Sequence, residues 1–307
     1  MKNRYEDYFL NIMAENSNVI ALFADSDFSK YDYLKKHFDG RCYNLGIAEC
    51  NMTGIAAGLA HEGYIPVVYT VNSFIAYRAY EFIRNICIQN LNVKFVGMGA
   101  GVIINNFGPT HHTTEDIAIL RVLPNLTLLS PASPNEVPPI ADKAIAHEGP
   151  VYIRLGKAFE KEIYTTYKPS FEIGKSTLIQ KGDDISIVAT GSIISNAIEA
   201  ACQLTAEGIN AEIINMTSLK PLDETAILQS AQKTGKVLTI EEHQIAGGLG
   251  GAVSELLCNK KINATLYRMG FNDVFCTDYG WHADLKQMYG LSPSNIFEKC
   301  KDLMKMQ

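Results

Sequence analysis

Several features that would place a protein in a specialised class are absent from this sequence. Its 307 residues contain no apolar run near the roughly 18 residues that a membrane span requires. The first ten residues, MKNRYEDYFL, hold no apolar core and no small-residue cleavage site, so we expect no secretory signal. Basic residues are not in excess, and the formal charge of −6 argues against nucleic acid or an anionic membrane as a partner.

Paired cysteines and nucleotide-binding loops are also lacking. The seven cysteines are scattered without a Cys-x-x-Cys pair or a metal-ligand spacing. An odd number of scattered cysteines is typical of a reducing compartment, so we expect a cytoplasmic protein. The glycine-rich stretch at residues 247–257, GGLGGAVSELL, has no Lys-Ser/Thr pair and no strict Gly-x-Gly-x-x-Gly spacing, which favours a closely packed helix start.

The sequence does contain a regular alternation of short β-rich runs and helical patterns. Hydrophobic content of 47% and charged content of 20% are ordinary for a globular protein. We expect strands at residues 19–25, 42–45, 65–70, 93–98, 126–130 and 151–155, and helices at residues 31–38, 45–60, 74–90, 114–122 and 134–146. Such alternation predicts a parallel sheet with helices on both faces.

A second alternation follows a break in the pattern. Residues 156–170 are rich in charge and tyrosine and predict a linker. Further strands are expected at residues 185–191, 211–216, 236–243 and 264–270, with helices between them. We therefore predict an α/β protein of two domains, residues 1–164 and 165–307, each a mainly parallel sheet flanked by helices.

One acidic residue lies in an unusually apolar stretch. Residues 45–60 read LGIAECNMTGIAAGLA, and Glu49 has no basic residue near it in sequence. A helix this poor in charge is buried on most faces, and a carboxylate carried into it is costly without a partner. Glu49 either points to water, pairs with a distant arginine, or meets a nitrogen of a ligand.

The surrounding motifs resemble the pyrimidine-binding domain of transketolases. The block around NLGIAECNM is followed by an aromatic helix and then by the Gly-Pro-Thr-His loop at Gly108. The resemblance spans most of the chain and implies that Glu49 hydrogen-bonds the aminopyrimidine ring of thiamine diphosphate. In that family the acid favours the imino tautomer, whose exocyclic nitrogen removes the thiazolium proton, and low dielectric helps such a carboxyl hold a proton.

The resemblance also assigns roles to aromatic residues. Phe74, Tyr77 and Tyr80 are spaced i, i+3, i+6 on one predicted helix, a spacing that is usually a core stripe. The family places aromatic residues at these positions around the pyrimidine ring, with Tyr77 expected to stack on it.

Two histidines in GPTHHTTED are further candidates. By resemblance His111 lies at the substrate carbonyl and helps proton transfer, since histidine titrates near working pH. His112 is a second candidate for substrate contact, although adjacent side chains point in different directions. Thr113 or Thr114 is expected to cap the following helix.

Three other residues are candidates for contacts with substrate. Arg154 ends a predicted strand, where the family holds a substrate phosphate, although a structural ion pair is the alternative. Ser29 follows the first strand. Phe107 stands where single-chain transketolases often have an Asp that contacts a sugar hydroxyl. A family histidine that helps to hold phosphate aligns with about Gly99, so the chain lacks it.

The metal-binding half of the family is absent from the chain. Transketolases bind the diphosphate through Mg²⁺ with a Gly-Asp-Gly motif, which the sequence lacks; Gly182-Asp183-Asp184 followed by Asn210 only mimics its spacing. We expect no metal ligand here and a separate N-terminal transketolase subunit that carries the Mg²⁺–diphosphate site. The resemblance implies an α2β2 heterotetramer with homodimeric contacts, acting on sugars or sugar phosphates.

Other readings stay open at this stage. 1-Deoxyxylulose-5-phosphate synthase shares the acid and the Gly-Pro-Thr-His loop but is normally one long chain. The β subunit of 2-oxoacid dehydrogenases has this length without these motifs. A non-catalytic transketolase half that only binds a partner is a third alternative, against which the intact Glu49 and His111 argue.

Overall fold

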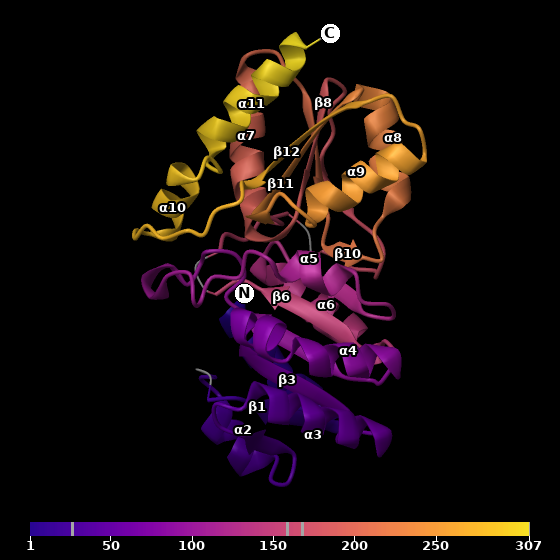
Figure 1. Ribbon diagram of the computed structural model, residues 1–307, viewed down its shortest axis with the longest axis vertical. Coiled ribbons are helices and arrows are strands. Elements are labelled where there is room, and N and C mark those ends of the chain that lie inside the picture. The colour runs from indigo at the N-terminus through magenta and orange to yellow at the C-terminus, as the bar shows by residue number, and fades with distance from the viewer. Residues whose placement is uncertain (26–27, 158–159, 167–168, 307) are drawn as a thin grey trace.

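The computed structural model describes residues 1–25, 28–157, 160–166 and 169–306. Two α/β bodies are stacked along the long axis of the molecule, with the C-terminus at the far end of the second (Figure 1). Within the described ranges, no helix combines the length and the apolar character needed to span a bilayer.

The first body is built on a seven-stranded sheet in the order β10-β5-β6-β4-β3-β1-β2. Its strands are β1 (Val19–Phe23), β2 (Cys42–Asn44), β3 (Ile65–Val71), β4 (Lys94–Met98), β5 (Thr127–Leu129), β6 (Val151–Leu155) and β10 (Ser218–Lys220). All neighbours pair in parallel except β10, which is antiparallel to β5. Every residue of β1, β4 and β6 is buried, because helices cover both faces of a parallel sheet.

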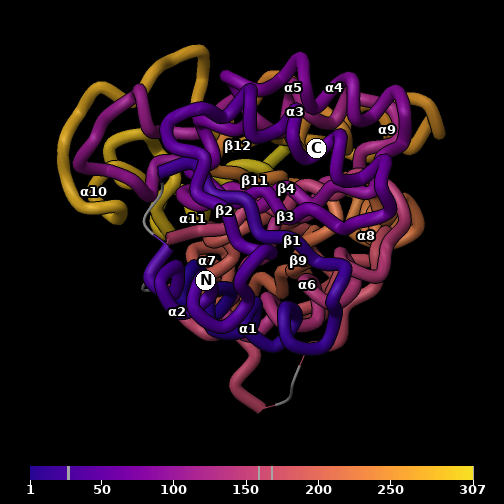
Figure 2. The backbone as a smooth tube through the Cα atoms, turned by 90° about the horizontal axis from the view of Figure 1, so that it is seen from below, coloured from indigo at the N-terminus to yellow at the C-terminus, as the bar shows by residue number. Residues whose placement is uncertain are grey.

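The helices of the first body lie on both faces of this sheet. They are α1 (Lys2–Glu15), α2 (Tyr31–His37), α3 (Glu49–His61), η1 (Phe74–Arg78), α4 (Tyr80–Ile88), η2 (Asn105–Phe107), α5 (Asp116–Arg121), η3 (Pro134–Glu136) and α6 (Val137–Ala146). Helices α3, α4 and α5 cover one face, while α1 and α6 pack together on the other (Figure 2). The two hydrophobic cores therefore lie on opposite sides of the sheet.

The second body has a five-stranded sheet in the order β12-β11-β8-β9-β7. Its elements are β7 (Thr177–Gln180), β8 (Ile185–Ala189), η4 (Gly191–Ile193), α7 (Ile194–Ala206), β9 (Ala211–Asn215), α8 (Glu224–Thr234), β11 (Lys236–Gln244), α9 (Leu249–Asn259), β12 (Thr265–Phe271), α10 (His282–Met288) and α11 (Pro293–Lys305). Four strands are parallel, and β7 pairs with β9 in the antiparallel direction. The predicted fold class, two mainly parallel sheets flanked by helices, is confirmed.

Some local predictions were wrong. The expected helix over residues 74–90 is divided into the π-helix η1 and the α-helix α4, with a break at Ala79. Helix α3 begins at Glu49 instead of residue 45. The N-cap of α5 is Glu115, without a side-chain cap bond, so neither Thr113 nor Thr114 caps it.

The boundary near residue 165 stays a prediction, but the two bodies share structure across it. Strand β10 comes from the second half of the chain and completes an edge of the first sheet. One hydrophobic cluster contains residues of α4 and α5 together with residues of α8 and α9. Strands β7 and β10 had not been expected from the sequence.

Candidate active site

Glu49 is the buried acid that the sequence predicts, and its partner is an arginine. The side chain is 4% exposed at the first turn of α3. The Arg78 Nη1 donates to both carboxylate oxygens, at 3.1 and 3.2 Å. The Arg78 side chain is 47% exposed, so the pair has a buried acid and a base that reaches solvent. Arg78 lies 29 residues away in sequence, and sequence analysis missed it.

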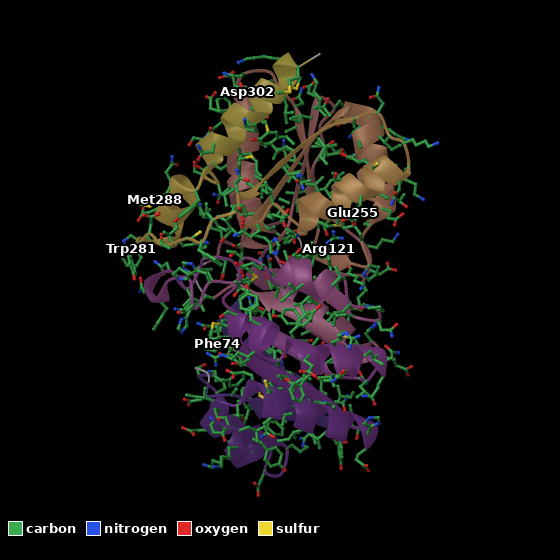
Figure 3. All side chains as sticks on the ribbon, viewed as in Figure 1. Phe74, Arg121, Glu255, Trp281, Met288 and Asp302 are labelled. Atoms are coloured by element: carbon green, nitrogen blue, oxygen red, sulfur yellow. The ribbon has the colours of Figure 1, made fainter. Side chains whose placement is uncertain are left out.

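The π-helix η1 brings Arg78 back over an aromatic ring. The guanidinium carbon of Arg78 lies 4.0 Å from the centroid of Phe74, within cation–π distance. A π-helix widens one turn of the chain and changes which side chains share a face. Phe74 therefore lies beside the Glu49–Arg78 pair (Figure 3 labels Phe74).

Tyr77 and Tyr80 occupy different surroundings, so the three aromatic residues do not form one α-helical stripe. Tyr80 is partly buried against the core and donates its hydroxyl to the Ile119 carbonyl at 2.9 Å. Tyr77 is 38% exposed and donates to Glu115 Oε2 at 2.5 Å. Burial, the Asp116 charge and the Glu115 hydrogen bond raise the pKa of Tyr77, which keeps its hydroxyl a donor.

His111 extends the same group of contacts on the loop after β4. Its ring lies 5.0 Å from that of Phe74, edge to face, and 4.8 Å from that of Phe107. Its Nδ1 is 2.9 Å from the Thr110 hydroxyl. Burial and the nearby Arg78 charge lower the pKa of His111, so its imidazole is neutral at neutral pH. Phe107 is 61% exposed at the edge of this group.

His112 is buried and carries two nitrogens without a hydrogen bond. The residue is 3% exposed, and neither Nδ1 nor Nε2 has a partner among the described residues. Burial and the His111 charge lower the pKa of His112. A buried imidazole with no partner is unusual, and it leaves two polar atoms that a ligand or a water molecule can satisfy.

The loop that carries these histidines is closed at its base. Gly101 and Thr113 exchange two backbone hydrogen bonds, at 3.1 and 2.8 Å. Gly101 has a φ of +66°, and a Cβ there would meet Glu242 of β11 at 2.6 Å. The loop base is thus held between the first sheet and the second body.

Arg154 lies inside the molecule, which differs from the open phosphate contact expected of it. The side chain is 3% exposed, and its Nε donates to the buried Asp116 at 2.8 Å. Its Nη2 donates to the carbonyls of Thr113 and Glu242 at 3.0 and 2.9 Å. The second body covers this end of β6, so the residue joins the two bodies. The phosphate contact stays a prediction that this geometry does not favour.

Ser29 is engaged within the first body. Its hydroxyl and backbone N–H both donate to the fully buried Glu6, the latter at 3.1 Å. Its role toward a ligand stays a prediction. Among the residues that the structure describes, no three His, Cys, Asp or Glu side chains gather as a metal site would require. The Asp184 segment that mimics a metal motif is a turn: Asp184 Oδ2 accepts from the Asn210 N–H at 2.6 Å.

Comparison with known proteins agrees with these motifs. Residues 1–159 match the family model of the transketolase pyrimidine binding domain, and residues 174–296 match that of the transketolase C-terminal domain. A 6-deoxy-6-sulfo-D-fructose transketolase subunit of Clostridium sp. (strain MSTE9) is 35% identical over 96% of this chain and 92% of that protein. The 1-deoxy-D-xylulose-5-phosphate synthase 1 of Geobacter metallireducens is 38% identical over 96% of this chain but only 47% of that protein.

A solved structure covers nearly the whole chain. It is described as a split gene transketolase, inactive beta4 tetramer, and it aligns with a TM-score of 0.88 at 38% identity over 98% of this chain and 97% of that one. Two family models match in the order of the two bodies, and both a relative and a solved structure cover nearly the whole chain. The chain therefore belongs to the transketolase family.

Proposed function

We propose that the chain is the C-terminal subunit of a thiamine-diphosphate-dependent transketolase, which transfers a two-carbon ketol unit from a ketose to an aldose. The observation that carries the proposal is the Glu49 carboxyl, which is buried at the start of an apolar helix and which, among the described residues, pairs with the half-exposed Arg78. A ring nitrogen that replaces Arg78 would find an acid already ordered by the fold.

The residues around Glu49 fit the aminopyrimidine end of the cofactor. Phe74 supplies aromatic surface beside the acid, and Tyr77 lies on the same π-helix. On the loop after β4, His112 offers two buried nitrogens without partners among the described residues. When bound, the cofactor supplies the carbanion-stabilising chemistry of its thiazolium ring. Glu49 orients the pyrimidine and holds a proton at its ring nitrogen. His111, neutral and 5.0 Å from Phe74, receives or returns a proton at a substrate oxygen.

A partner subunit completes the proposed site. Ile47, two residues before the acid, is 76% exposed; Tyr77 of η1 is 38% exposed, and Phe107, which contacts His111, is 61% exposed. Exposed apolar residues near a site mark a surface that another chain covers. We propose that an N-terminal transketolase subunit lies there and supplies the Mg²⁺–diphosphate site, in an α2β2 assembly. All seven cysteines are free, which supports a reducing compartment such as the cytoplasm.

The second candidate reaction is that of 1-deoxyxylulose-5-phosphate synthase, favoured by the 38% identity to such an enzyme. The two reactions differ in their donor: a synthase releases CO₂ from a 2-oxo acid, while a transketolase releases an aldose from a ketose. Release of CO₂ from pyruvate by the assembled enzyme, without turnover of any ketose, would favour the synthase. A dehydrogenase-like enzyme also releases CO₂ from a 2-oxo acid but does not join the remaining two-carbon unit to an aldose, so CO₂ release that depends on an added aldose distinguishes the synthase from it. The non-catalytic alternative predicts neither CO₂ nor ketose turnover.

The proposal is tested by replacing Glu49 in the assembled enzyme. Glu49→Gln should slow exchange of the cofactor's thiazolium proton by at least ~100-fold, the scale of one positioned acid–base group. Glu62→Gln, an exposed residue next to the C-terminal end of the same helix, is the matched control and should exchange at the original rate. An unchanged exchange rate in Glu49→Gln would remove the acid from the mechanism.

A further inference from the structure

A separate cavity of about 780 Å³ lies between the two bodies. Glu49, Phe74 and His111 do not line it. Its walls come from the loop before η2, from residues that follow β6, and from α7, α10 and the start of α11. Trp281, which Figure 3 labels at the edge of the molecule, stands at its rim and is 77% exposed.

The cavity lies where an open α/β sheet usually binds ligands. From β8 the chain continues to β9 on one side, and it later returns to β11 on the other side of β8. Ligands in such sheets bind beyond the carboxyl ends of the two strands at this switch point. Ser192 follows β8, and Glu242 lies near the end of β11. Both therefore occupy the crevice of the second sheet.

Glu242 is fully engaged within the chain. Its Oε2 is 2.7 Å from His282 Nε2, and its Oε1 accepts from the Ser192 hydroxyl at 2.8 Å. Burial disfavours its charge, but the charge and hydrogen bond of His282, with Lys286 and Ser192, lower its pKa overall. The carboxylate thus holds Ser192 and His282, two residues that line the cavity, in place.

Lys286 is a buried cation with one hydrogen bond among the described residues, to Asn196. The residue is 8% exposed and lines the cavity, and its Nζ donates to Asn196 Oδ1 at 3.0 Å. No carboxylate of the described residues lies within 4.0 Å of this ammonium, which has three donors to satisfy. Lys157 and Lys161 also line the cavity, together with the acidic residues Glu199 and Glu160. The Glu160 Oε2 accepts from the Met1 amino group at 2.6 Å.

We infer that this cavity binds a small anion bearing a phosphate, sulfonate or carboxylate group, with Lys286 as the buried anchor. The Lys157 and Lys161 side chains, which also line the cavity, add positive charge, and the Ser195 hydroxyl and Asn196 amide contribute neutral polar groups. Glu49 and His111 do not line this cavity, so anion binding there can be measured without turnover.

An anion bound in this cavity would affect the loop that carries His111. Asn105 lines the cavity and donates its side-chain amide to the Gly280 carbonyl, which precedes Trp281 and His282. An anion bound by Lys286, Lys157 and Lys161 would hold the contact between Asn105 of the loop and Gly280 of the second body in one arrangement. Two sources supply such an anion: the acidic end of a sugar, or a separate ion that regulates the enzyme.

Trp281 is the single tryptophan of the chain, so its fluorescence reports the cavity. Inorganic phosphate, titrated into the full chain at constant ionic strength, should change this fluorescence with saturation in the millimolar range or below. Lys286→Met should weaken the apparent affinity at least ~10-fold, because a charge-assisted hydrogen bond is lost, while Lys286→Arg should retain most of it. Lys305→Met, which removes the same charge at the far end of α11, should behave as the parent chain.

Two results would overturn the inference: a response without saturation, or the same affinity in Lys286→Met. If circular dichroism shows that Lys286→Met does not fold, the double variant Lys157→Met/Lys161→Met is used instead. The inference then requires that this double variant weakens phosphate binding several-fold. A sugar phosphate that binds much more tightly than phosphate assigns the cavity to the substrate's acidic end. Equal affinities assign it to a separate anion, and neither result depends on catalysis.

Discussion

Removing the Arg154 guanidinium should destabilise the protein strongly, because it would leave a buried carboxylate alone. Asp116 is fully buried; its Oδ2 accepts from Arg154 and from the Asn72 amide, both at 2.8 Å. Its Oδ1 has no hydrogen-bond partner among the described residues. In Arg154→Met the negative charge of Asp116 stays in the core with only one donor.

The size of the effect follows from this arrangement. Breaking a buried ion pair by removing one partner costs about 3–5 kcal/mol, and the carbonyls of Thr113 and Glu242 would also lose their donor. The double variant Arg154→Met/Asp116→Asn removes both charges and should recover a large part of the loss. Residues in one network of this kind interact by about 0.5–3 kcal/mol in a double-mutant cycle.

The measurement is guanidinium unfolding followed by circular dichroism, with calorimetry to detect separate unfolding of the two bodies. Arg121→Met is the matched control: Arg121 also joins the two bodies, through Glu255 of α9, but Glu255 is 60% exposed (Figure 3). A surface pair of this kind contributes about 0–1 kcal/mol. If Arg154→Met costs no more than Arg121→Met and instead lowers kcat/KM only for phosphorylated sugars, the structural role is refuted and the phosphate contact is favoured.

Three further predictions concern the histidines and the aromatic residues. Burial lowers the pKa values of His111 and His112, so below pH 6.5 the unfolded chain binds more protons than the folded chain. The melting temperature should therefore fall as the pH drops from 6.5, and a melting temperature that does not change with pH would contradict this. Tyr77→Ala should weaken cofactor affinity in the assembled enzyme by about 0.5–1.5 kcal/mol, whereas Tyr77→Phe, which loses the two hydrogen bonds to the Glu115 carboxylate and backbone N–H, should bind nearly normally; equal losses would make those bonds the cause. Phe107→Asp should raise kcat/KM for hydroxylated ketoses relative to deoxy analogues, and an unchanged ratio would place Phe107 outside the substrate pocket.

The sheets and the acid could be predicted because their signals are local. Continuous apolar runs predicted the strands of both bodies other than β7 and β10, and an isolated carboxylate in a charge-poor stretch singled out Glu49. The π-helix could not be predicted, because FIAYR has no residue type that distinguishes a five-residue turn from an α-helical one. Strand β10 was missed because three residues are too few to show a periodicity, and its partner β5 lies far from it in the sequence, in the first half of the chain.

Arg154 shows why a general rule for locating ligand sites did not hold for this chain. The rule that ligands bind at the carboxyl ends of parallel strands places Arg154 in a crevice, and β6 does end there. In this chain the crevice above β6 is filled by the second body, whose Glu242 carbonyl accepts from the guanidinium at 2.9 Å. The packing of the two bodies decides whether this position is an open anion site or a buried ion pair. That packing cannot be predicted from the sequence of one strand.

The Glu49–Arg78 pair shows the same dependence on tertiary contacts, with a consequence for assembly. An arginine that shields a buried acid lowers the cost of keeping that acid in a chain without its cofactor. Because the Arg78 side chain is 47% exposed and rests on the Phe74 ring, it can move into solvent without breaking the core. The pair is therefore suited to an exchange in which a ligand nitrogen takes the acid and the guanidinium turns outward. On the proposed assembly, that exchange occurs at the surface that the partner subunit covers, so cofactor binding and subunit association would stabilise each other.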